Sequence, residues 1–275
     1  MEIWQTFFVQ PLLNGLLLFY HLFFNNLGLA IIALTVAIRL VLTPLVLPSM
    51  RAMQKMKDYA PELAKLKEKH KGDKTKLMQA QADFYKSKGI NPASGCLPQI
   101  AQLVVLIALF QVFSQTLYSN GDMVERVNRL AYPALTVKNQ PSTGFLLLDL
   151  TKPDTFRLPG LPIPLPGLFL VAAALIQLLS SKMMTPAVKK EAAVAKKTPG
   201  EMDDIMAATQ QQMLYLFPAL TIFIGFSFPS GLVLYWLVFS FFQAVQQYMV
   251  SGWGGLAPWL RAAGLLKLAS NEKTK

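Results

Sequence analysis

The 275-residue sequence has few of the side chains on which enzymes depend. It contains one cysteine, Cys96, so no disulfide can form within the chain. Its two histidines, His21 and His70, lie far apart, and no spacing of metal-ligating residues fits a metal site. No glycine-rich phosphate loop precedes a helix. We therefore expect no catalytic residue, no metal site and no cofactor.

Charged residues are also scarce, at 15% of the chain against 53% hydrophobic residues. A membrane-spanning helix needs about 20 apolar residues, more than an ordinary core helix has. The fourth of the apolar runs below is short and contains Pro218, which a helix bundle in a membrane tolerates. We therefore predict an all-α, polytopic membrane protein rather than a soluble one. Its five expected transmembrane helices are 28–48, 96–118, 163–183, 212–228 and 231–250.

The basic residues are concentrated in alternate segments between these runs. Segment 49–95 has eleven lysines and arginines, and 184–211 and 251–275 have four each. The helix-poor loop 119–162 has five, and residues 1–27 have none. Since cytoplasmic loops are enriched in basic residues, we expect the N-terminus outside and the C-terminal tail in the cytoplasm. The lack of an Arg-rich transit sequence favours a bacterial plasma membrane, or a chain whose presequence has been removed.

Two segments outside the runs are expected to be helical. Residues 1–27 are apolar but interrupted by Pro11, which favours an interfacial helix on the outer face, with a sixth span as the alternative. Segment 49–95 has helical spacing on both sides of a turn at residues 71–74, which predicts a cytoplasmic helical hairpin. A plain solvated connector is the alternative. The adaptable apolar stripe suited to client capture comprises Met50, Met53, Met56, Leu63 and Phe84.

One arginine, Arg39, lies near the centre of the apolar run 28–48. A charge at that depth costs about 2.5–3.5 kcal/mol on insertion scales, so the site must supply water or a partner. Thr35 and Thr43 stand four residues to either side and share a helix face with Arg39. None of the 15 acidic residues lies inside an apolar run, which weakens the alternative of a structural ion pair. We expect a hydrated cavity that awaits a partner from outside the chain.

Other apolar runs also carry polar side chains at helical spacing. Interhelical hydrogen bonding is the common use of such residues. Four stripes, one of them with an unpaired arginine, instead favour a shared polar groove, in which water reaches Thr35 and Gln102. Besides the stripe of Arg39, the stripes are Gln99 with Gln102, Gln177 with Ser181, and Trp236 with Ser240, Gln243 and Gln247.

Three pieces of the sequence resemble the YidC/Oxa/Alb family of membrane protein insertases. They are TVAIRLVLTPL (35–45), NPASGCLPQ (91–99) and FPSGLVLYW (228–236). The order of elements is similar over nearly the whole chain. The large soluble domain and extra N-terminal span of Gram-negative members do not occur in this sequence, so we expect the short, five-span bacterial form.

The resemblance implies a groove that opens to the cytoplasm and to lipid and is closed on the outer side. Arg39 matches the groove arginine of the family, and the hairpin matches a mobile cytoplasmic element required for activity. Positions that match groove-lining or substrate-contacting residues are Thr35, Gln102, Gln177, Tyr235 and Trp236. The implied partners are nascent membrane proteins and the lipid bilayer, with no direct nucleic-acid specificity. Some members also engage the Sec translocon or bind the ribosome through a long basic tail, which is short here.

These features predict a non-enzymatic membrane protein insertase and chaperone, which receives nascent membrane proteins in a hydrophilic groove and releases them into lipid. The main alternative is a small-solute transporter or channel with an anion site at Arg39. Transporters often show repeated halves, and this sequence shows no internal repeat. A third reading is an assembly factor that holds membrane proteins without inserting them.

Overall fold

The computed structural model describes residues 2–70, 72–91, 97–116, 122–160, 162–184 and 215–265. The chain divides into two compact units, which we describe separately. The first unit comprises Met1–Val46, Cys96–Gln177 and Phe217–Gln243. The second comprises Leu47–Gly95, Leu178–Leu216 and Ala244–Lys275.

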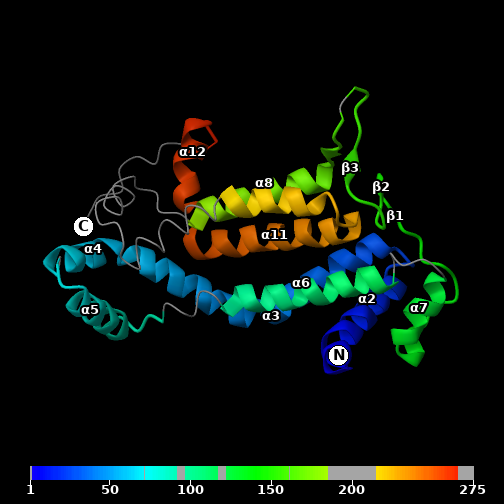
Figure 1. Ribbon diagram of the computed structural model, residues 1–275, viewed down its shortest axis with the longest axis horizontal. Helices are drawn as coiled ribbons and strands as arrows, with labels where there is room; N and C mark the ends of the chain where they lie inside the picture. Colours follow the sequence, from blue (N-terminus) through cyan, green and yellow to red (C-terminus); the bar gives the residue numbers. More distant parts are fainter. Residues whose placement is uncertain are drawn as a thin grey trace. The chain divides into compact units, whose positions relative to one another are not determined.

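Helices make up most of the described chain (Figure 1). The longer helices are α2 (Gln10–Leu22), α3 (Leu27–Asp58), α5 (Lys74–Ser87), α6 (Leu97–Thr116), α8 (Leu168–Met184), the helix Tyr215–Gly225 and α11 (Ser230–Ser251). The shorter ones are α1 (Glu2–Trp4), the π-helical η1 (Gln5–Val9), α4 (Ala60–Lys69), α7 (Met123–Leu130), η3 (Pro133–Leu135), η4 (Gly254–Leu256) and α12 (Ala257–Ala262).

Two helices, α3 and α11, are long and apolar enough to cross a membrane. Three further apolar helices are shorter as described: Ile100–Thr116, Leu168–Met184 and Tyr215–Gly225. The predicted runs 96–118 and 212–228 extend into residues outside the described ranges, and the expected loop 184–211 lies almost wholly outside them. The architecture is that of a helical membrane protein.

The all-α prediction missed two small β-hairpins in the loop before α8. Strand β1 (Gly144–Phe145) pairs antiparallel with β2 (Leu148–Asp149). Strand β3 (Thr155–Phe156) pairs antiparallel with β4 (Leu165–Pro166). Proline has no backbone N–H and a fixed φ, so this proline-rich loop cannot continue a helix and forms turns instead.

Two expected helix boundaries also differ from the structure. Helix α3 runs without a break through Pro44 and Pro48 to Asp58, so the first apolar run and the start of the predicted hairpin form one helix of 32 residues. At the N-terminus, helical backbone begins at Glu2 rather than at Pro11, because the π-helical η1 leads directly into α2. Prolines are tolerated in membrane helices because neighbouring groups satisfy the freed carbonyls.

The core of the first unit lies between α2, α3, α6 and α11. Its buried side chains include Leu13, Leu16, Leu34, Leu109, Phe113, Leu232 and Tyr235. Two polar contacts fix the N-terminal helices in place: the Trp4 indole donates to Gln111 Oε1 at 2.8 Å, and Asn14 Nδ2 donates to the Leu130 carbonyl at 3.1 Å. Between membrane helices, such packing and hydrogen bonds, rather than the hydrophobic effect, provide the association energy.

Residues 149–154 form a strap across the N-terminal end of α11. The Ser230 amide donates to the Lys152 carbonyl at 2.7 Å, and the Gly231 amide donates to the Leu150 carbonyl at 3.0 Å. The Ser230 hydroxyl donates to the Asp149 carbonyl at 2.7 Å. A Cβ at Gly231 would lie 2.8 Å from the Phe113 ring, so this close approach requires glycine.

The same strap caps α8. Asp154 is 2% exposed, and its Oδ2 accepts a hydrogen bond from the Leu170 amide in the first turn of α8 at 2.7 Å. Its carbonyl accepts from the Gly167 amide, also at 2.7 Å. A carboxylate there satisfies a free helix N–H group and complements the helix dipole. The strap therefore joins the N-terminal ends of two apolar helices that are distant in sequence.

The strap turn is stabilised by Asp149. Burial raises the pKa of its carboxyl, but hydrogen bonds from Thr151, and further ones from the Lys152 and Thr143 side chains, outweigh this effect and lower the pKa to about 2. A carboxyl whose pKa is lowered by folding stabilises the fold at pH values above its pKa in the unfolded chain, which is about 3.9 for aspartate. The stabilisation is therefore complete at neutral pH and is lost only as the pH falls towards 2.

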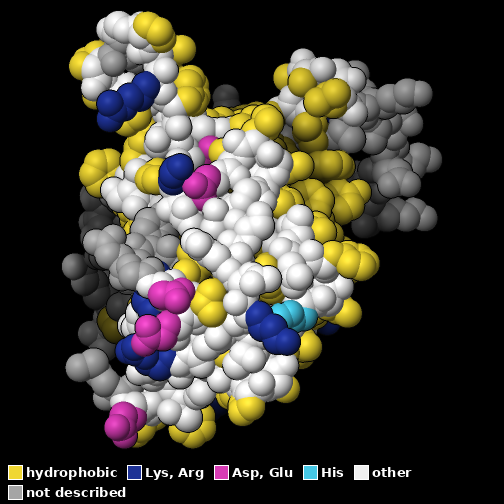
Figure 2. Space-filling view, turned by 90° about the vertical axis from the view of Figure 1, so that its right-hand side faces the viewer, with side chains coloured by type: hydrophobic (Ala, Val, Ile, Leu, Met, Phe, Trp, Pro, Cys, Tyr) yellow, Lys and Arg dark blue, Asp and Glu magenta, His cyan; other side chains and the backbone are white. Residues whose placement is uncertain are grey.

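Figure 2 shows the end of the first unit that carries α7 and the short strands. Charged side chains of both signs lie across this face, while hydrophobic side chains gather towards its edges. Exposed ion pairs join Arg129 to Glu125 at 3.0 Å and Lys152 to Asp149 at 3.1 Å. Ion pairs at the surface add little stability. The charged side chains make this face suited to contact with water.

In the second unit, α4 and α5 form a hairpin around the turn at Gly72, whose φ is +108°. The rings of Tyr59 and Phe84 meet edge to face, with centroids 6.0 Å apart. Lys88 forms an ion pair with Glu62 at 3.0 Å, and its ammonium lies 4.3 Å from the centroid of the Tyr59 ring. These four side chains, which we call the hairpin cluster, hold the two helices together.

Candidate client groove around Arg39

Arg39 is 4% exposed on α3. Its Cζ lies 4.1 Å from the centroid of the Phe239 ring and 5.5 Å from that of Phe242, both on α11. Among the described residues, Nε and Nη2 of Arg39 have no hydrogen-bond partner. No carboxylate in the same part of the chain forms an ion pair with this guanidinium. The described contacts therefore do not support a structural arginine held by an internal ion pair.

The two threonines of the polar stripe are satisfied within α3 itself. The Thr35 hydroxyl donates to the Ile31 carbonyl at 2.6 Å, and the Thr43 hydroxyl donates to the Arg39 carbonyl at 2.7 Å. A threonine hydroxyl within a helix commonly forms such a hydrogen bond with a carbonyl of the preceding turn. The unmet hydrogen-bonding capacity of this face therefore resides in Arg39.

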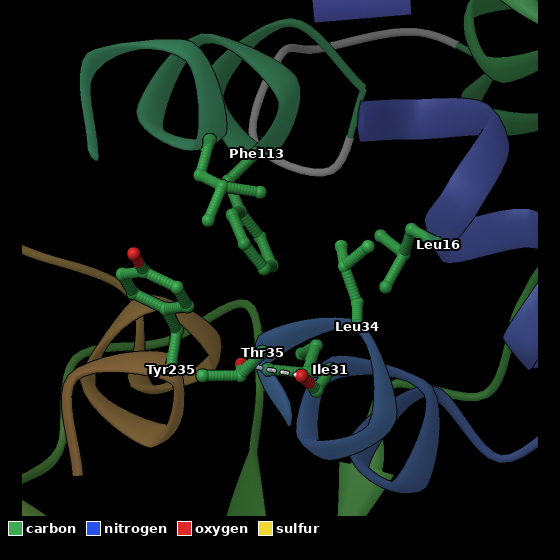
Figure 3. Close-up of a pocket in the computed structure, with 7 residues that line it drawn as sticks. Leu16, Ile31, Leu34, Thr35, Phe113 and Tyr235 are labelled. Atoms are coloured by element: carbon green, nitrogen blue, oxygen red, sulfur yellow. Dashed lines mark hydrogen bonds between the residues drawn. The ribbon is translucent and has the colours of Figure 1, made fainter. Parts of the chain in front are cut away.

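Tyr235 connects three of the predicted groove residues. Its hydroxyl accepts a hydrogen bond from Gln102 Nε2 at 2.9 Å, and its ring centroid lies 6.1 Å from that of Phe239, the ring that contacts Arg39. Tyr235 also faces Thr35 across a narrow gap, as Figure 3 shows. The structure thus brings Thr35, Arg39, Gln102 and Tyr235 together from α3, α6 and α11.

The gap beside Thr35 is lined almost entirely by apolar side chains (Figure 3). Phe113 of α6 and Leu16 of α2 point into it, and the remaining space is too small for a water molecule. Thr35 is 1% exposed. This packing closes the site on the side of Arg39 that lies towards the start of α3.

The other two predicted groove residues have different neighbours. Gln177 on α8 accepts a hydrogen bond from the Thr221 hydroxyl at 2.7 Å, which links α8 to the helix Tyr215–Gly225. The half-buried Trp236 stacks on Phe228, with ring centroids 6.2 Å apart. No described contact joins either of them to Arg39.

The hairpin residues expected to capture clients are buried or half-buried. Met50 is 9% exposed, and Phe84 belongs to the hairpin cluster. Met78 on α5 was not singled out from the sequence, although its side chain is 61% exposed. The half-buried members of the predicted stripe are Met53, Met56, Leu63 and Phe84.

Two ring positions next to Arg39 were also missed. Phe239 follows Tyr235 by four residues, and Phe242 follows Phe239 by three, so the three rings share one helix face. That spacing was a usable signal, but an aromatic residue in an apolar run is ordinarily read as core or lipid-facing. Within the described ranges, no group of three or more metal-ligating side chains comes together.

Comparison with known proteins connects this geometry to a family. The family model described as 60Kd inner membrane protein matches residues 18–254. The membrane protein insertase YidC of Syntrophobacter fumaroxidans is 34% identical to this chain over 90% of its length, which is 38% of the relative. For the proteins of the same name from Pelagibacter ubique and Cupriavidus pinatubonensis, identity is 35% and 32%, over 89% and 90% of this chain.

The chain spans less than two fifths of the length of these curated relatives, at 38%, 38% and 36%. The matched part includes Arg39 and the whole of α3, α6 and α11. The match over most of the chain decides the classification: this protein belongs to the YidC/Oxa/Alb family of membrane protein insertases.

Proposed function

We propose that this protein is a membrane protein insertase and chaperone. It receives nascent membrane proteins in a hydrophilic groove within the bilayer and releases them into lipid, alone or with the Sec translocon. The observation that carries the proposal is the buried Arg39, whose guanidinium has donors without a partner among the described residues. The names of the curated relatives support the same function.

The groove shortens the dry path that a hydrophilic tail of the client must cross. At an effective dielectric constant of about 20, Arg39 and a client carboxylate about 4 Å apart attract by roughly 4 kcal/mol before desolvation is subtracted. An interaction of this size holds a tail transiently. The apolar client helix then leaves into lipid beside α8 and α11, driven by the burial of apolar surface and by the membrane potential acting on acidic tails.

The proposed topology has five spans, provided by α3, α6, α8, the helix Tyr215–Gly225 and α11. The N-terminus lies outside and the C-terminus in the cytoplasm of a bacterial cell, with α2 at the outer interface. Basic residues concentrated in 49–95, 184–211 and 251–275 support this orientation. We keep the Sec translocon and the ribosome as proposed partners, and no enzymatic step is involved. The relatives' names do not support a small-solute transporter.

Reconstitution tests the function directly. Purified protein in liposomes is expected to insert a short single-span client without ATP, measured by protease protection of the translocated tail. Empty liposomes and liposomes with a denatured sample are the controls. A client that remains fully protease-accessible in all three preparations would contradict insertase activity.

We further propose that the hairpin of α4 and α5 takes part in client capture. The exposed Met78 of α5 and the half-buried Met53 and Met56 near the end of α3, just before the hairpin, offer adaptable apolar surface to a client helix. Met50 on α3 is 9% exposed, and Phe84 contacts Tyr59 within the hairpin cluster, so both offer less surface to a client.

Deletion of the hairpin tip, residues 67–76, is expected to leave a stable, membrane-inserted protein with weaker insertion activity. The hairpin cluster lies outside the deleted residues, so the hairpin helices keep their main contacts. Thermal unfolding in detergent measures the stability, and the reconstituted assay measures the activity. If the shortened protein no longer accumulates in the membrane, the hairpin is needed for folding and the capture role loses its support.

A further inference from the structure

The two donors of Arg39 that lack a partner lie on one edge of its guanidinium. Nε and Nη2 point away from Cδ on the same side of the planar group, about as far apart as the two oxygens of a carboxylate. This edge forms two parallel N–H···O bonds with a carboxylate. At 4% exposure, the edge is buried and unpaired among the described residues. A buried fork of this kind requires an acceptor from elsewhere.

The same guanidinium also lies over aromatic rings of α11. Phe239 lies 4.1 Å from Cζ, well within the 6 Å range of a cation–π contact, and Phe242 lies 5.5 Å away. The ring provides no nitrogen or oxygen acceptor, so the cation–π contact leaves the Nε and Nη2 donors available for the two-bond fork. The ring also restricts the rotation of a long side chain that has many rotamers.

We propose that Phe239 is a positioning residue for client insertion. Its ring holds the guanidinium of Arg39 so that the Nε and Nη2 edge is presented to a carboxylate in the client's translocated tail. The proposal rests on the proposed insertase function and deepens it by naming the residue that orients the groove arginine towards its client.

The α11 helix offers a matched control. Phe241 is two residues from Phe239 but is 60% exposed, and it makes no contact with Arg39. Phe239→Leu removes the ring and keeps an apolar side chain, while Phe239→Tyr keeps the ring. Phe241→Leu makes the same chemical change away from the guanidinium. Phe242, farther from Cζ, provides an intermediate position in the series.

The test compares insertion rates in liposomes for two single-span clients, one with an acidic tail and one with the acids replaced by their amides. Phe239→Leu is expected to slow the acidic client roughly five- to thirtyfold, which corresponds to the loss of one desolvated cation–π contact. The insertion rate of the amide client should change by less than about twofold in the same variant. Phe239→Tyr and Phe241→Leu should both stay close to the parent for both clients.

An Arg39→Gln background separates positioning from simple packing. In that background Phe239→Leu is expected to have no further effect on the acidic client, because there is no guanidinium to hold. Equal loss for both clients, or an undiminished loss in the Arg39→Gln background, would show that Phe239 only packs the helices. Should Phe239→Leu fail to fold, Phe239→Met of similar size replaces it in the same comparison. If the parent inserts neither client, the insertase function itself fails.

Discussion

The Arg39→Ala variant is expected to insert clients with acidic translocated tails at least about tenfold more slowly than the parent protein. A tenfold change corresponds to about 1.4 kcal/mol, which is well below the roughly 4 kcal/mol of attraction available before desolvation. Arg39→Lys should keep part of the activity, because lysine retains the charge but loses the two-donor fork. Arg39→Glu should be at least as defective as alanine. Initial insertion rates in reconstituted liposomes measure all three.

The tail of the client provides the second arm of this experiment. Replacing its acids by amides should shrink the difference between parent and Arg39→Ala, because the attraction has lost one partner. The four rates form a double-mutant cycle, and a coupling close to zero would be inconsistent with charge reading by Arg39. Arg39 would then act by hydrating the groove or by thinning the bilayer around it.

Accessibility to water should divide the predicted groove into two zones. In a Cys96→Ala background, Gln102→Cys is expected to react with a membrane-impermeant thiol reagent added on the cytoplasmic side, since Gln102 is only half-buried. Thr35→Cys should react at least about tenfold more slowly, because a buried apolar setting disfavours the reactive thiolate. Thr35 is 1% exposed and borders a gap too small for water.

The sequence alone led us to expect both positions to be reached by water, so this experiment also tests how the structure changes that view. Phe241→Cys, on the exposed side of α11, serves as a lipid-facing control that should not react with a reagent confined to water. Equal rapid labelling of Thr35→Cys and Gln102→Cys from the cytoplasm would mean that the groove extends past Arg39. Labelling of Gln102→Cys only from the outside would reverse the proposed topology.

The helical body of the protein was predictable from apolar runs, because a run near 20 residues has few alternatives to a membrane helix. The helix ends were less predictable. Pro11, Pro44 and Pro48 are strong breakers in soluble helices, yet the structure carries helical backbone through all three. The strap at 149–154 was missed, because its hydrogen bonds join residues 16 and 81 positions apart.

The site residues that could be predicted from the sequence are the polar or charged ones that lie within apolar runs. Arg39 stands out because a charge in an apolar run is costly, and Gln102 stands out because it is polar in a similar run. Tyr235 was identified through the resemblance and proves to hydrogen-bond with Gln102. Phe239 could not be identified in this way, because its role depends on a distance to α3 that only the folded chain supplies.

The strap has a mechanical consequence for the proposed release of clients. Because residues 149–154 bind the N-terminal ends of both α8 and α11, those two ends cannot separate without breaking several hydrogen bonds. If α8 and α11 move apart, they must therefore rotate about the strap, and the displacement is largest at their C-terminal ends. Helix α8 has 17 residues and is about 25 Å long at 1.5 Å per residue. A rotation of about 10° would move its free end by roughly 4 Å, which would widen the space between the free ends of the two helices while their strapped ends stay together.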